Sequence, residues 1–369
     1  MEYIAILGRQ PKLSIAELES LYGKVEPLSK NVVKFTTDKS VNIDRLGGTI
    51  KLATPIDDLP FNYLLNLPAG KLTFGLSDYS DTPKRGDEIQ KEVLTIKRRL
   101  AVKNRSARIV LSQKHLPVLA TAEVIHNRLG QKPTAVELIR HNNNYYRQVG
   151  VQDINAYSRR DYERPARDAR VGMLPPKLAQ ILINLAGDLP EGSTILDPFC
   201  GTGVVLQEAL LMNYLAYGTD LDHRMIDYSR TNLDWLLREK RHLAPDSYRL
   251  AQGDATTFKW QPPISAIASE IYLGPPLTTI PDAVKLMSIK AGIQELFDTF
   301  LKNLAPQLAK GTPVVLAIPA WATKNGKFTS LSLDEIEKMG YNVINSAENL
   351  LYHREGQIVA RKIIRLRKK

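Results

Sequence analysis

The side chains best able to do chemistry lie in one stretch, Asp197-Pro-Phe-Cys-Gly-Thr-Gly203, and in Asp220, which follows 23 residues after Asp197. The two glycines let the backbone turn sharply and approach a ligand closely. An acid about twenty residues further on is where dinucleotide-binding folds place the carboxylate that binds a ribose. Leu206 stands where a third glycine would complete the dinucleotide fingerprint, so that fingerprint is not met.

The acid that opens this turn indicates which ligand it would hold. A carboxylate repels a pyrophosphate and attracts a cationic or amino-bearing group. S-adenosylmethionine carries a sulfonium, an amino group and a ribose, and therefore suits the arrangement. The alternative is a glycine turn that binds nothing, but the whole pattern with its spaced acid is more specific than that.

Strands and a helix must position these residues. Thr194–Leu196 is short, β-branched and apolar, which predicts a buried strand, and 204–212 predicts a helix. The turn between them then lies in the crevice where open α/β sheets bind cofactors. Further predicted strands and helices alternate along the chain, and together they favour a doubly wound, mostly parallel sheet with an antiparallel edge. They are strands 215–219, 248–251, 264–269 and 313–318, helices 223–239, 288–308 and 332–338, and a closing hairpin of 341–350 and 357–366.

A second acid follows the third predicted strand, in Gln252-Gly-Asp254-Ala255. In a methyltransferase-type sheet this position lies beside an adenine, and Asp254 can accept a hydrogen bond from the adenine amino group. The alternative is an aspartate that only caps the next turn.

Composition bounds the class of protein. A chain of 369 residues exceeds one ordinary core, so several domains are expected. The formal charge of +11 suits a polyanionic partner. Cys200 is the sole cysteine, which excludes an internal disulfide and favours a reducing compartment. The sequence has no secretory signal, no apolar run long enough for a membrane helix and no histidine spacing typical of metal sites, so a cytoplasmic protein without metal or membrane is expected.

The N-terminal half predicts two small α+β units. The first has strands 3–7, 32–36 and 49–53 and a helix over Ser14–Tyr22, with Ser14 and Glu17 as a capping box. The second contains a helix over Gly86–Val102 among short strands. The predicted domains are 1–62, 63–155, a linker at 156–172, and 173–369.

Two basic segments could contact phosphates. Between Lys97 and Arg108 the chain has six basic residues and no acid, which indicates either phosphate contact or a solvated helix face. The segment Arg361–Lys369 alternates as a strand, and could either track phosphates or be an edge strand protected by charge.

The motifs resemble those of the THUMP-domain RNA methyltransferases, closest to the tRNA guanosine-10 N2-methyltransferase type. The resemblance rests on 197–203, Gly218-Thr-Asp220, Gly253-Asp254-Ala255 and the entry Arg159–Pro165 with Met173–Ala179. It implies an N-terminal ferredoxin-like part, a THUMP-like RNA-binding domain and a C-terminal Rossmann-like domain that methylates tRNA at guanine N2. The implied cofactor contacts are Asp197, Pro198, Phe199, Gly201, Gly203, Asp220, Asp254 and Ala255. The implied RNA contacts are Lys97, Arg98, Arg99, Arg105 and Arg164.

The sequence departs from the family at one important place. The family's amine-methylating motif is Asp/Asn-Pro-Pro-Tyr, just after the fourth strand. Here the strand runs into Glu270-Ile-Tyr-Leu-Gly274-Pro-Pro-Leu277. Aligning from the strand puts Glu270 at the acid, whereas aligning the two prolines puts Gly274 there and Leu277 at the aromatic position. We prefer the first alignment because it keeps a carboxylate at the strand end.

That carboxylate has a definite chemical purpose. The guanine N2 lone pair is delocalised into the ring, so the amine is a weak nucleophile. A carboxylate that accepts its N–H bonds orients it and favours the charge-developing transition state. Tyr272 is the aromatic residue of the altered motif and could stack on an extruded base, or it could point into the core of an inactive site. Cys200 is interpreted as a small turn residue and not as a nucleophile.

The sequence is therefore compatible with three functions. The preferred one is an S-adenosylmethionine-dependent tRNA methyltransferase acting on guanine N2, with tRNA as partner and with or without an accessory subunit. The first alternative is an amine methyltransferase acting on adenine N6 of RNA or DNA. The second is a tRNA-binding protein whose methyltransferase domain has lost its activity.

Overall fold

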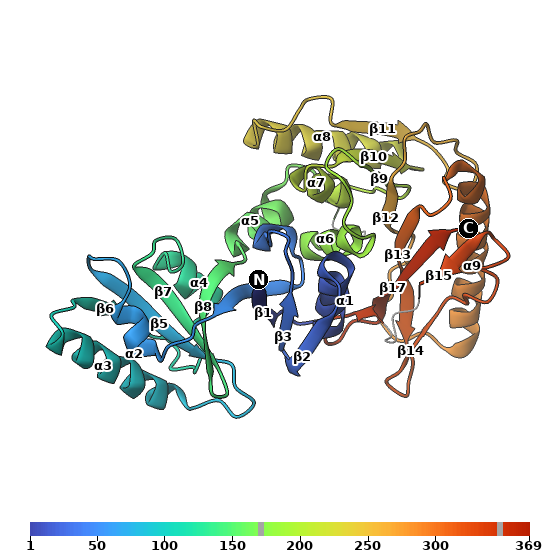
Figure 1. The fold of residues 1–369 in the computed structure, drawn as a ribbon. Helices are drawn as coiled ribbons and strands as arrows, with labels where there is room; N and C mark the ends of the chain where they lie inside the picture. The colour runs from blue at the N-terminus through green and yellow to red at the C-terminus, as the bar shows by residue number, and fades with distance from the viewer. Residues whose placement is uncertain (169–172, 345–349) are drawn as a thin grey trace. The chain divides into compact units, whose positions relative to one another are not determined.

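The chain forms two compact units, Met1–Ala156 and Tyr157–Lys369, in a computed structural model that describes residues 1–168, 173–344 and 350–369. Each unit is a mixed α/β structure with its own sheet (Figure 1). The candidate site belongs to the second unit, at one end of five neighbouring parallel strands.

Unit 1 (Met1–Ala156) is built on one sheet with the strand order β2-β3-β1-β4-β8-β7-β5-β6. Its strands are β1 (Glu2–Leu7), β2 (Val25–Ser29), β3 (Val32–Thr36), β4 (Thr49–Pro55), β5 (Leu72–Asp78), β6 (Ala107–Ile109), β7 (Ala135–His141) and β8 (Asn144–Val151). Its helices are α1 (Pro11–Tyr22), α2 (Pro60–Leu65), α3 (Gly86–Val102) and α4 (Thr121–His126), with a 3-10 turn η1 (Ile43–Arg45).

The sheet of unit 1 continues across the predicted domain boundary at residue 62. Strand β4 pairs antiparallel with β8, from Lys51 opposite Val151 to Pro55 opposite Tyr146. Backbone hydrogen bonds therefore join the predicted domains 1–62 and 63–155 in one sheet. The sequence gives no sign of this pairing because the two strands lie far apart along the chain.

Helix α1 begins earlier than predicted and has no capping box at Ser14. Pro11 is its first residue, so Ser14 lies within the helix, where its Oγ donates to the backbone oxygen of Gly48 at 2.8 Å. Glu17 is buried and accepts bonds from the backbone N–H groups of Gly47 and Gly48 at 2.9 and 2.8 Å. The two side chains therefore anchor the loop before β4.

Unit 2 (Tyr157–Lys369) confirms the predicted doubly wound sheet. Among the described residues its strand order is β11-β10-β9-β12-β13-β17-β15, with β14 paired to β13 and β16 to β17. The neighbouring strands β11, β10, β9, β12 and β13 are parallel, and β17 is antiparallel to β13. The strands are β9 (Thr194–Asp197), β10 (Leu215–Asp220), β11 (Tyr248–Gln252), β12 (Ala266–Glu270), β13 (Pro313–Ala322), β14 (Phe328–Ser330), β15 (Tyr341–Val343), β16 (Leu351–Tyr352) and β17 (Val359–Lys368).

Helices pack against this sheet and make its central strands fully buried. The helices that contact the sheet are α6 (Pro176–Leu185), α7 (Val204–Leu211), α8 (His223–Glu239) and α9 (Ala283–Leu304). The chain also forms α5 (Ile154–Ser158), a π-helical turn η2 (Arg159–Glu163) and a 3-10 turn η3 (Ala305–Gln307). Phe297 and Phe300 of α9 pack in one cluster with Leu196 of β9, Ile267 of β12 and Leu316 of β13. Buried parallel strands of this kind read as continuous apolar runs, which is why the sequence predicted them.

The C-terminal strand differs most from its prediction. Strand β17 pairs with β13 on one side and with β15 and β16 on the other, so it is an interior strand and not a charged edge. Its Arg361 is 5% exposed and does not track phosphates. In place of the predicted helix 332–338, the chain forms a turn over residues 334–340. Within the predicted strand 341–350, residues 345–349 lie outside the described residues.

Candidate active site

The glycine turn between β9 and α7 leaves space on one side. Gly201 has φ +50°, and a side chain added there would meet no atom within 4 Å. Gly203 has φ +81°, and a Cβ there would lie 2.9 Å from Ser229 Oγ of α8. Gly203 therefore packs closely against α8, whereas the space beside Gly201 is open.

Asp197 ends β9 as a buried carboxyl group, 2% exposed. Its Oδ1 accepts a bond from Ser269 Oγ at 2.5 Å and one from the Phe199 N–H at 3.2 Å. Burial, with smaller contributions from the carboxylates of Asp220 and Glu270, raises the pKa of Asp197 to about 7, although the bond from Ser269 lowers it. A positively charged ligand would favour its ionised form.

Asp220 ends β10 and holds the glycine turn. Its Oδ2 accepts from the Gly201 N–H at 2.9 Å, and its Oδ1 from the Asp222 N–H at 3.0 Å. Burial raises the pKa of Asp220 as well. The carboxylate predicted to bind a ribose thus also fixes the backbone of the turn beside it.

Asp254 follows β11 and caps the next turn. Its Oδ1 accepts from the Thr256 N–H at 2.8 Å and from Thr256 Oγ1 at 2.7 Å, as the capping alternative expected. The neighbouring Gly253 N–H donates to the backbone oxygen of Asp220 at 2.9 Å, which keeps this turn beside β10. Ala255 is 4% exposed and belongs to the hydrophobic core.

The remaining residues of the turn pack against the strands and helices around it. Pro198 is buried, and its backbone oxygen accepts from Thr219 Oγ1 at 3.3 Å. Phe199 packs edge-on against Phe300 of α9, with ring centroids 5.0 Å apart. The Cys200 thiol is buried, and burial raises its pKa well above the usual value, so it is a neutral turn residue.

Glu270, at the end of β12, forms an ion pair with Arg361 of β17. Burial raises the pKa of Glu270, and Arg361 lowers it. The sequence indicated a basic strand at Arg361–Lys369 but not this partner, so Arg361 is the residue that sequence reasoning missed. Next to Glu270, Ile271 is buried in the core and Tyr272 is 52% exposed, so the ring of Tyr272 does not lie in the core.

Three carboxyl groups therefore meet at the carboxyl edge of the parallel strands: Asp197, Asp220 and Glu270. Ser269 precedes Glu270 on β12 and donates to Asp197, which ties the ends of β9 and β12 together. Like charges close together in a buried place raise one another's pKa. A ligand with a sulfonium and an amino group fits this edge, because its positive charge would offset the repulsion.

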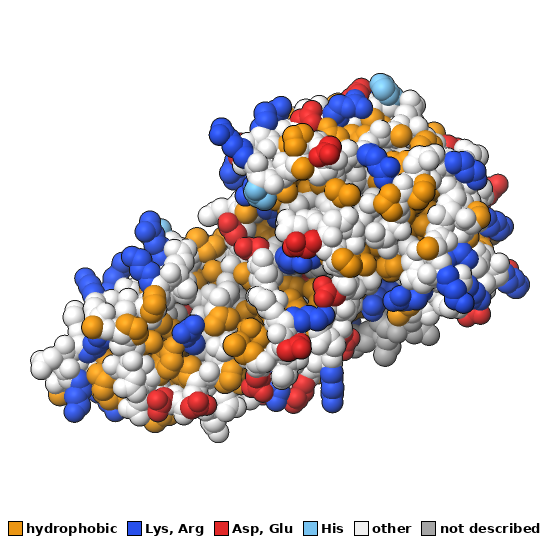
Figure 2. Space-filling model, turned by 45° about the horizontal axis from the view of Figure 1, so that its top comes forward, with side chains coloured by type: hydrophobic (Ala, Val, Ile, Leu, Met, Phe, Trp, Pro, Cys, Tyr) orange, Lys and Arg blue, Asp and Glu red, His pale blue; other side chains and the backbone are white. Residues whose placement is uncertain are grey.

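The predicted RNA-binding residues of unit 1 lie at the end of α3. Lys97, Arg98 and Arg99 are exposed, and Arg99 stacks on the Phe61 ring at 4.0 Å. Arg105 donates to the backbone oxygen of Leu67 at 3.0 Å. Basic side chains line a shallow groove of about 460 Å³ here: Lys71, Lys97, Arg105 and Arg108. Figure 2 shows Lys and Arg side chains spread over the visible face, with apolar ones between them.

Arg164 is not where an RNA phosphate could reach it. It is 2% exposed, its Nη2 lies 2.8 Å from Met173 Sδ, and burial lowers the pKa of its guanidinium. The expectation that it contacts RNA is therefore corrected: the segment after η2 folds inward, since Asn232 of α8 bonds the backbone of Ala166 at 2.9 Å. Residues 169–172 of the predicted linker lie outside the described residues.

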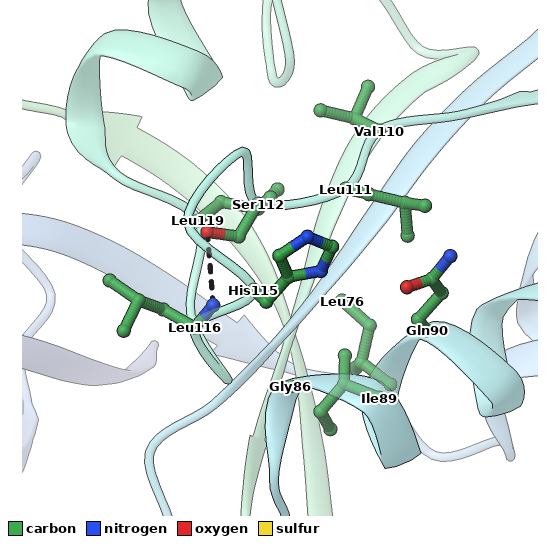
Figure 3. A pocket seen from close by; sticks show the side chains of 10 residues that line it. All are labelled: Leu76, Gly86, Ile89, Gln90, Val110, Leu111, Ser112, His115, Leu116 and Leu119. Carbon is green, nitrogen blue, oxygen red and sulfur yellow. Dashed lines mark hydrogen bonds between the residues drawn. The ribbon is translucent and has the colours of Figure 1, made fainter.

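A second cavity, in unit 1, is too small to hold a substrate or cofactor. Figure 3 shows His115, Gln90 and Ser112 among apolar side chains such as Leu76 and Ile89. Its volume is about 10 Å³, which is roughly the room of one water molecule. Within the described part of the chain, no group of three or more His, Cys, Asp or Glu is arranged to hold a metal, and no helix has the length and apolar character needed to cross a membrane.

Comparison with known proteins matches the part of the chain that contains these residues to a methyltransferase domain. Residues 164–323 match the UPF0020 family, described as an RMKL-like methyltransferase domain. A tRNA (guanine(10)-N2)-dimethyltransferase of Methanothermobacter thermautotrophicus is 31% identical over 148 residues, which cover 40% of this chain and 39% of that protein. A "probable tRNA (guanine(10)-N2)-dimethyltransferase" of Methanothermococcus thermolithotrophicus is 31% identical over 145 residues, covering 38% of this chain and 78% of that protein. The chain belongs to the same methyltransferase family as these proteins.

The matched methyltransferase domain contains the whole acidic edge, from Asp197 to Glu270. The chain spans about two fifths of the first curated relatives, 39% and 40% of their lengths. The fold of the full chain is similar to the crystal structure of TrmN from Thermus thermophilus, with a TM-score of 0.50, 17% identity and complete coverage of both chains. Arg361 lies outside the matched domain, which ends at residue 323.

Proposed function

We propose that this methyltransferase transfers a methyl group from S-adenosylmethionine to the N2 amine of a guanosine in tRNA, at position 10 as in the names of its relatives. The observation that carries the proposal is the buried acidic edge, where Asp197 and Asp220 flank the glycine turn and Glu270 follows the next parallel strand. The N-terminal unit then corresponds to the ferredoxin-like and THUMP-like parts, and the protein acts in the cytoplasm.

The residues of the turn fit the cofactor. Asp197 would attract its positive charge, Asp220 its ribose, and Asp254 its adenine, while Gly201 leaves the backbone accessible. S-adenosylmethionine supplies, when bound, a methyl group on a sulfonium that a nucleophile can attack directly. The protein then contributes mainly position and charge.

Glu270 and Tyr272 would act on the target base. The Glu270 carboxylate accepts N–H bonds of the guanine amine, which directs the nitrogen lone pair and stabilises the positive charge that develops on it. The base must leave its stack to reach the site. The ring of Tyr272, two residues further on and 52% exposed, is available to stack against it.

The basic groove of unit 1 would bind the tRNA backbone. Lysine and arginine contacts to phosphates fix position without reading sequence. Lys97 and Arg98 are exposed and available for this, whereas Arg105 also supports the loop at Leu67. Such contacts make binding weaker as salt concentration rises.

The decisive experiment is incubation with labelled S-adenosylmethionine and unmodified tRNA transcripts, followed by nucleoside analysis and mapping. N2-methylguanosine or N2,N2-dimethylguanosine at position 10 is the expected product. N6-methyladenosine would replace the proposal by the adenine alternative, and a tRNA with guanine 10 changed to adenine is the matched control.

A second function is favoured by one observation. The acid of the altered motif is already paired with Arg361 and no Pro-Pro-Tyr follows it, as in a domain that has lost its activity. The chain would then bind tRNA without methylating it. Saturable, salt-dependent tRNA binding together with no product in the labelled-cofactor assay would establish this alternative.

A further inference from the structure

One buried ion pair ties the end of β12 to β17. Arg361 donates from Nε to Oε2 of Glu270, and from Nη2 to Oε1 at 3.4 Å. The two side chains are only 6% and 15% exposed, so water competes little for the pair. Strand β13 lies between them, with Ala317 opposite Glu270 and Pro319 opposite Arg361.

We infer that Arg361 is a positioning residue for methyl transfer, which holds the Glu270 carboxylate ionised and oriented so that it can accept the N–H bonds of the target amine. This inference rests on the proposed function. It assigns a role to a residue outside the matched methyltransferase domain.

The geometry leaves Glu270 able to do this. A carboxylate has about four acceptor positions on its two oxygens. Arg361 occupies one position on each oxygen, so each oxygen retains acceptor capacity for an amine N–H. The planar guanidinium also fixes the plane of the carboxylate, which a lysine ammonium would not do.

The competing explanation is that the ion pair between Glu270 and Arg361 only holds the strands together. The strands are already joined by backbone pairing, because β13 pairs with β17 from Pro313 to Trp321 and with β12 from Val314 to Ala317. Buried ion pairs add little net stability, since desolvation of the charges offsets their attraction. The position of this pair next to Ser269, which binds Asp197, favours a role in the chemistry.

The charges around Glu270 determine what removing the arginine does. Arg361 of β17 favours the ionised form, whereas Glu270 and Asp197 of β9 repel each other, and Asp220 of β10 acts on Asp197. Without the cation, the pKa of Glu270 rises. Because the amine needs an ionised acceptor, the low-pH limb of the activity profile then moves to higher pH.

The test compares Arg361→Met and Arg361→Lys with Arg367→Met, which removes a cation from the same strand at an exposed residue that bonds the backbone of Gly311. Arg361→Met is expected to move the low-pH limb of kcat upward by about 1 to 3 pH units, with KM for tRNA unchanged. Arg361→Lys should restore the limb but not the full kcat, and Arg367→Met should match wild type.

A second readout needs no turnover. The thermal unfolding midpoint of Arg361→Met should differ least from wild type well below the ordinary glutamate pKa of about 4.3, where Glu270 is protonated in both the folded and unfolded states. The difference should grow as pH rises, because the unpaired carboxyl must then ionise while buried. On a Glu270→Gln background, Arg361→Met should cause no further loss of kcat, since it acts through Glu270.

The outcomes separate the two proposals. Suppose that wild type methylates tRNA, that the low-pH limb of kcat is the same in Arg361→Met, and that the two unfolding midpoints differ by the same amount at every pH. The inference then fails while the proposed function stands. A wild type that binds cofactor and methylates no tRNA overturns both. If Arg361→Met does not fold, Arg361→Lys and the double variant Glu270→Gln/Arg361→Gln carry the same comparison.

Discussion

At the scale of single residues, the carboxyl group of Asp197 is the main charged group of the proposed cofactor site. It is buried, it bonds Ser269 of the neighbouring strand, and its pKa is about 7. Near neutral pH a small change in its surroundings therefore decides whether it carries a charge. A cationic ligand selects the charged form, so ligand binding and ionisation of this group are linked.

The first prediction concerns this linkage. Binding of S-adenosylmethionine, measured by titration calorimetry, should be about tenfold weaker at pH 6 than at pH 8, because one pH unit below a pKa of about 7 leaves about a tenth of Asp197 ionised. Asp197→Asn should weaken binding at pH 8 and remove this part of the pH dependence. Equal ratios of wild-type to variant affinity at both pH values would contradict the assignment.

The same shift has a consequence for stability. The pKa of Asp197 is raised from 3.8 to about 7, so the unfolded chain binds fewer protons than the folded one between about pH 4 and 7. The free energy of unfolding of the ligand-free protein therefore falls as pH rises through this window and levels off above it. Asp197→Asn should flatten the curve.

The second prediction concerns Glu270. Glu270→Gln keeps the shape of the side chain and removes its charge, so cofactor affinity should stay within about twofold of wild type while kcat falls about 100- to 1,000-fold, the usual effect of losing one preorganised polar contact. Single-turnover methylation of tRNA measures this. Wild-type rates in the variant would remove Glu270 from the chemistry.

How far the sequence predicts the site depends on where each partner lies. Asp197, Asp220 and Glu270 each follow a buried apolar run, so the meeting of their strand ends at one edge follows from the parallel sheet. Arg361 lies 91 residues beyond Glu270, and its contact depends on which strand packs beside β13. Arg164 stands in a charged segment that reads as exposed, yet the chain folds it into the interior.

At the scale of elements, the turn between β9 and α7 divides its tasks between two glycines. Both have positive φ, but Gly203 faces Ser229 of α8 and Gly201 faces open space. Local sequence shows that both positions need a turn. It does not show which of them is packed and which is open, because that depends on the position of α8.

The third prediction separates the two positions. Gly203→Ala should lower the free energy of unfolding by about 1–2 kcal/mol or more, from the left-handed backbone and the contact with Ser229 Oγ. Gly201→Ala should cost less stability but weaken cofactor binding more, since its methyl group enters the open side of the turn. Urea unfolding without ligand and calorimetric binding measure both, and the reverse order would contradict this division.

Elements formed from local signals were predicted well. Helix α3 spans Gly86–Val102 and α8 spans His223–Glu239, as their periodicity indicated. Helix α1 shows the limit. Ser14 and Glu17 have the spacing of a capping box, but both bind the backbone near Gly48, more than thirty residues away in sequence. Local spacing carries no information about such a partner.

At the scale of the whole molecule, the proposed tasks fall in different units. The acidic edge belongs to Tyr157–Lys369 and the basic groove to Met1–Ala156, and each unit has its own sheet. A change in the groove should therefore affect tRNA binding without affecting the cofactor.

The fourth prediction tests this separation. Replacing Lys97 and Arg108 of the groove by serine should weaken tRNA binding and reduce the slope of log K against log salt by about 2, because each lost phosphate contact removes about 0.9. Cofactor affinity should not change. Serine at the exposed Lys24 and Lys132 of the same unit is the control with equal charge loss. An equal effect of both pairs would point to net charge and exclude a specific groove.

The interior place of β17 also sets an order of assembly. Strands β9 to β13 and the whole acidic edge are synthesised before residues 359–368 leave the ribosome. Until those residues pair with β13 and β15, the ion pair between Glu270 and Arg361 cannot form. The proposed cofactor turn can thus form before Glu270 gains the arginine that we propose positions it for the base.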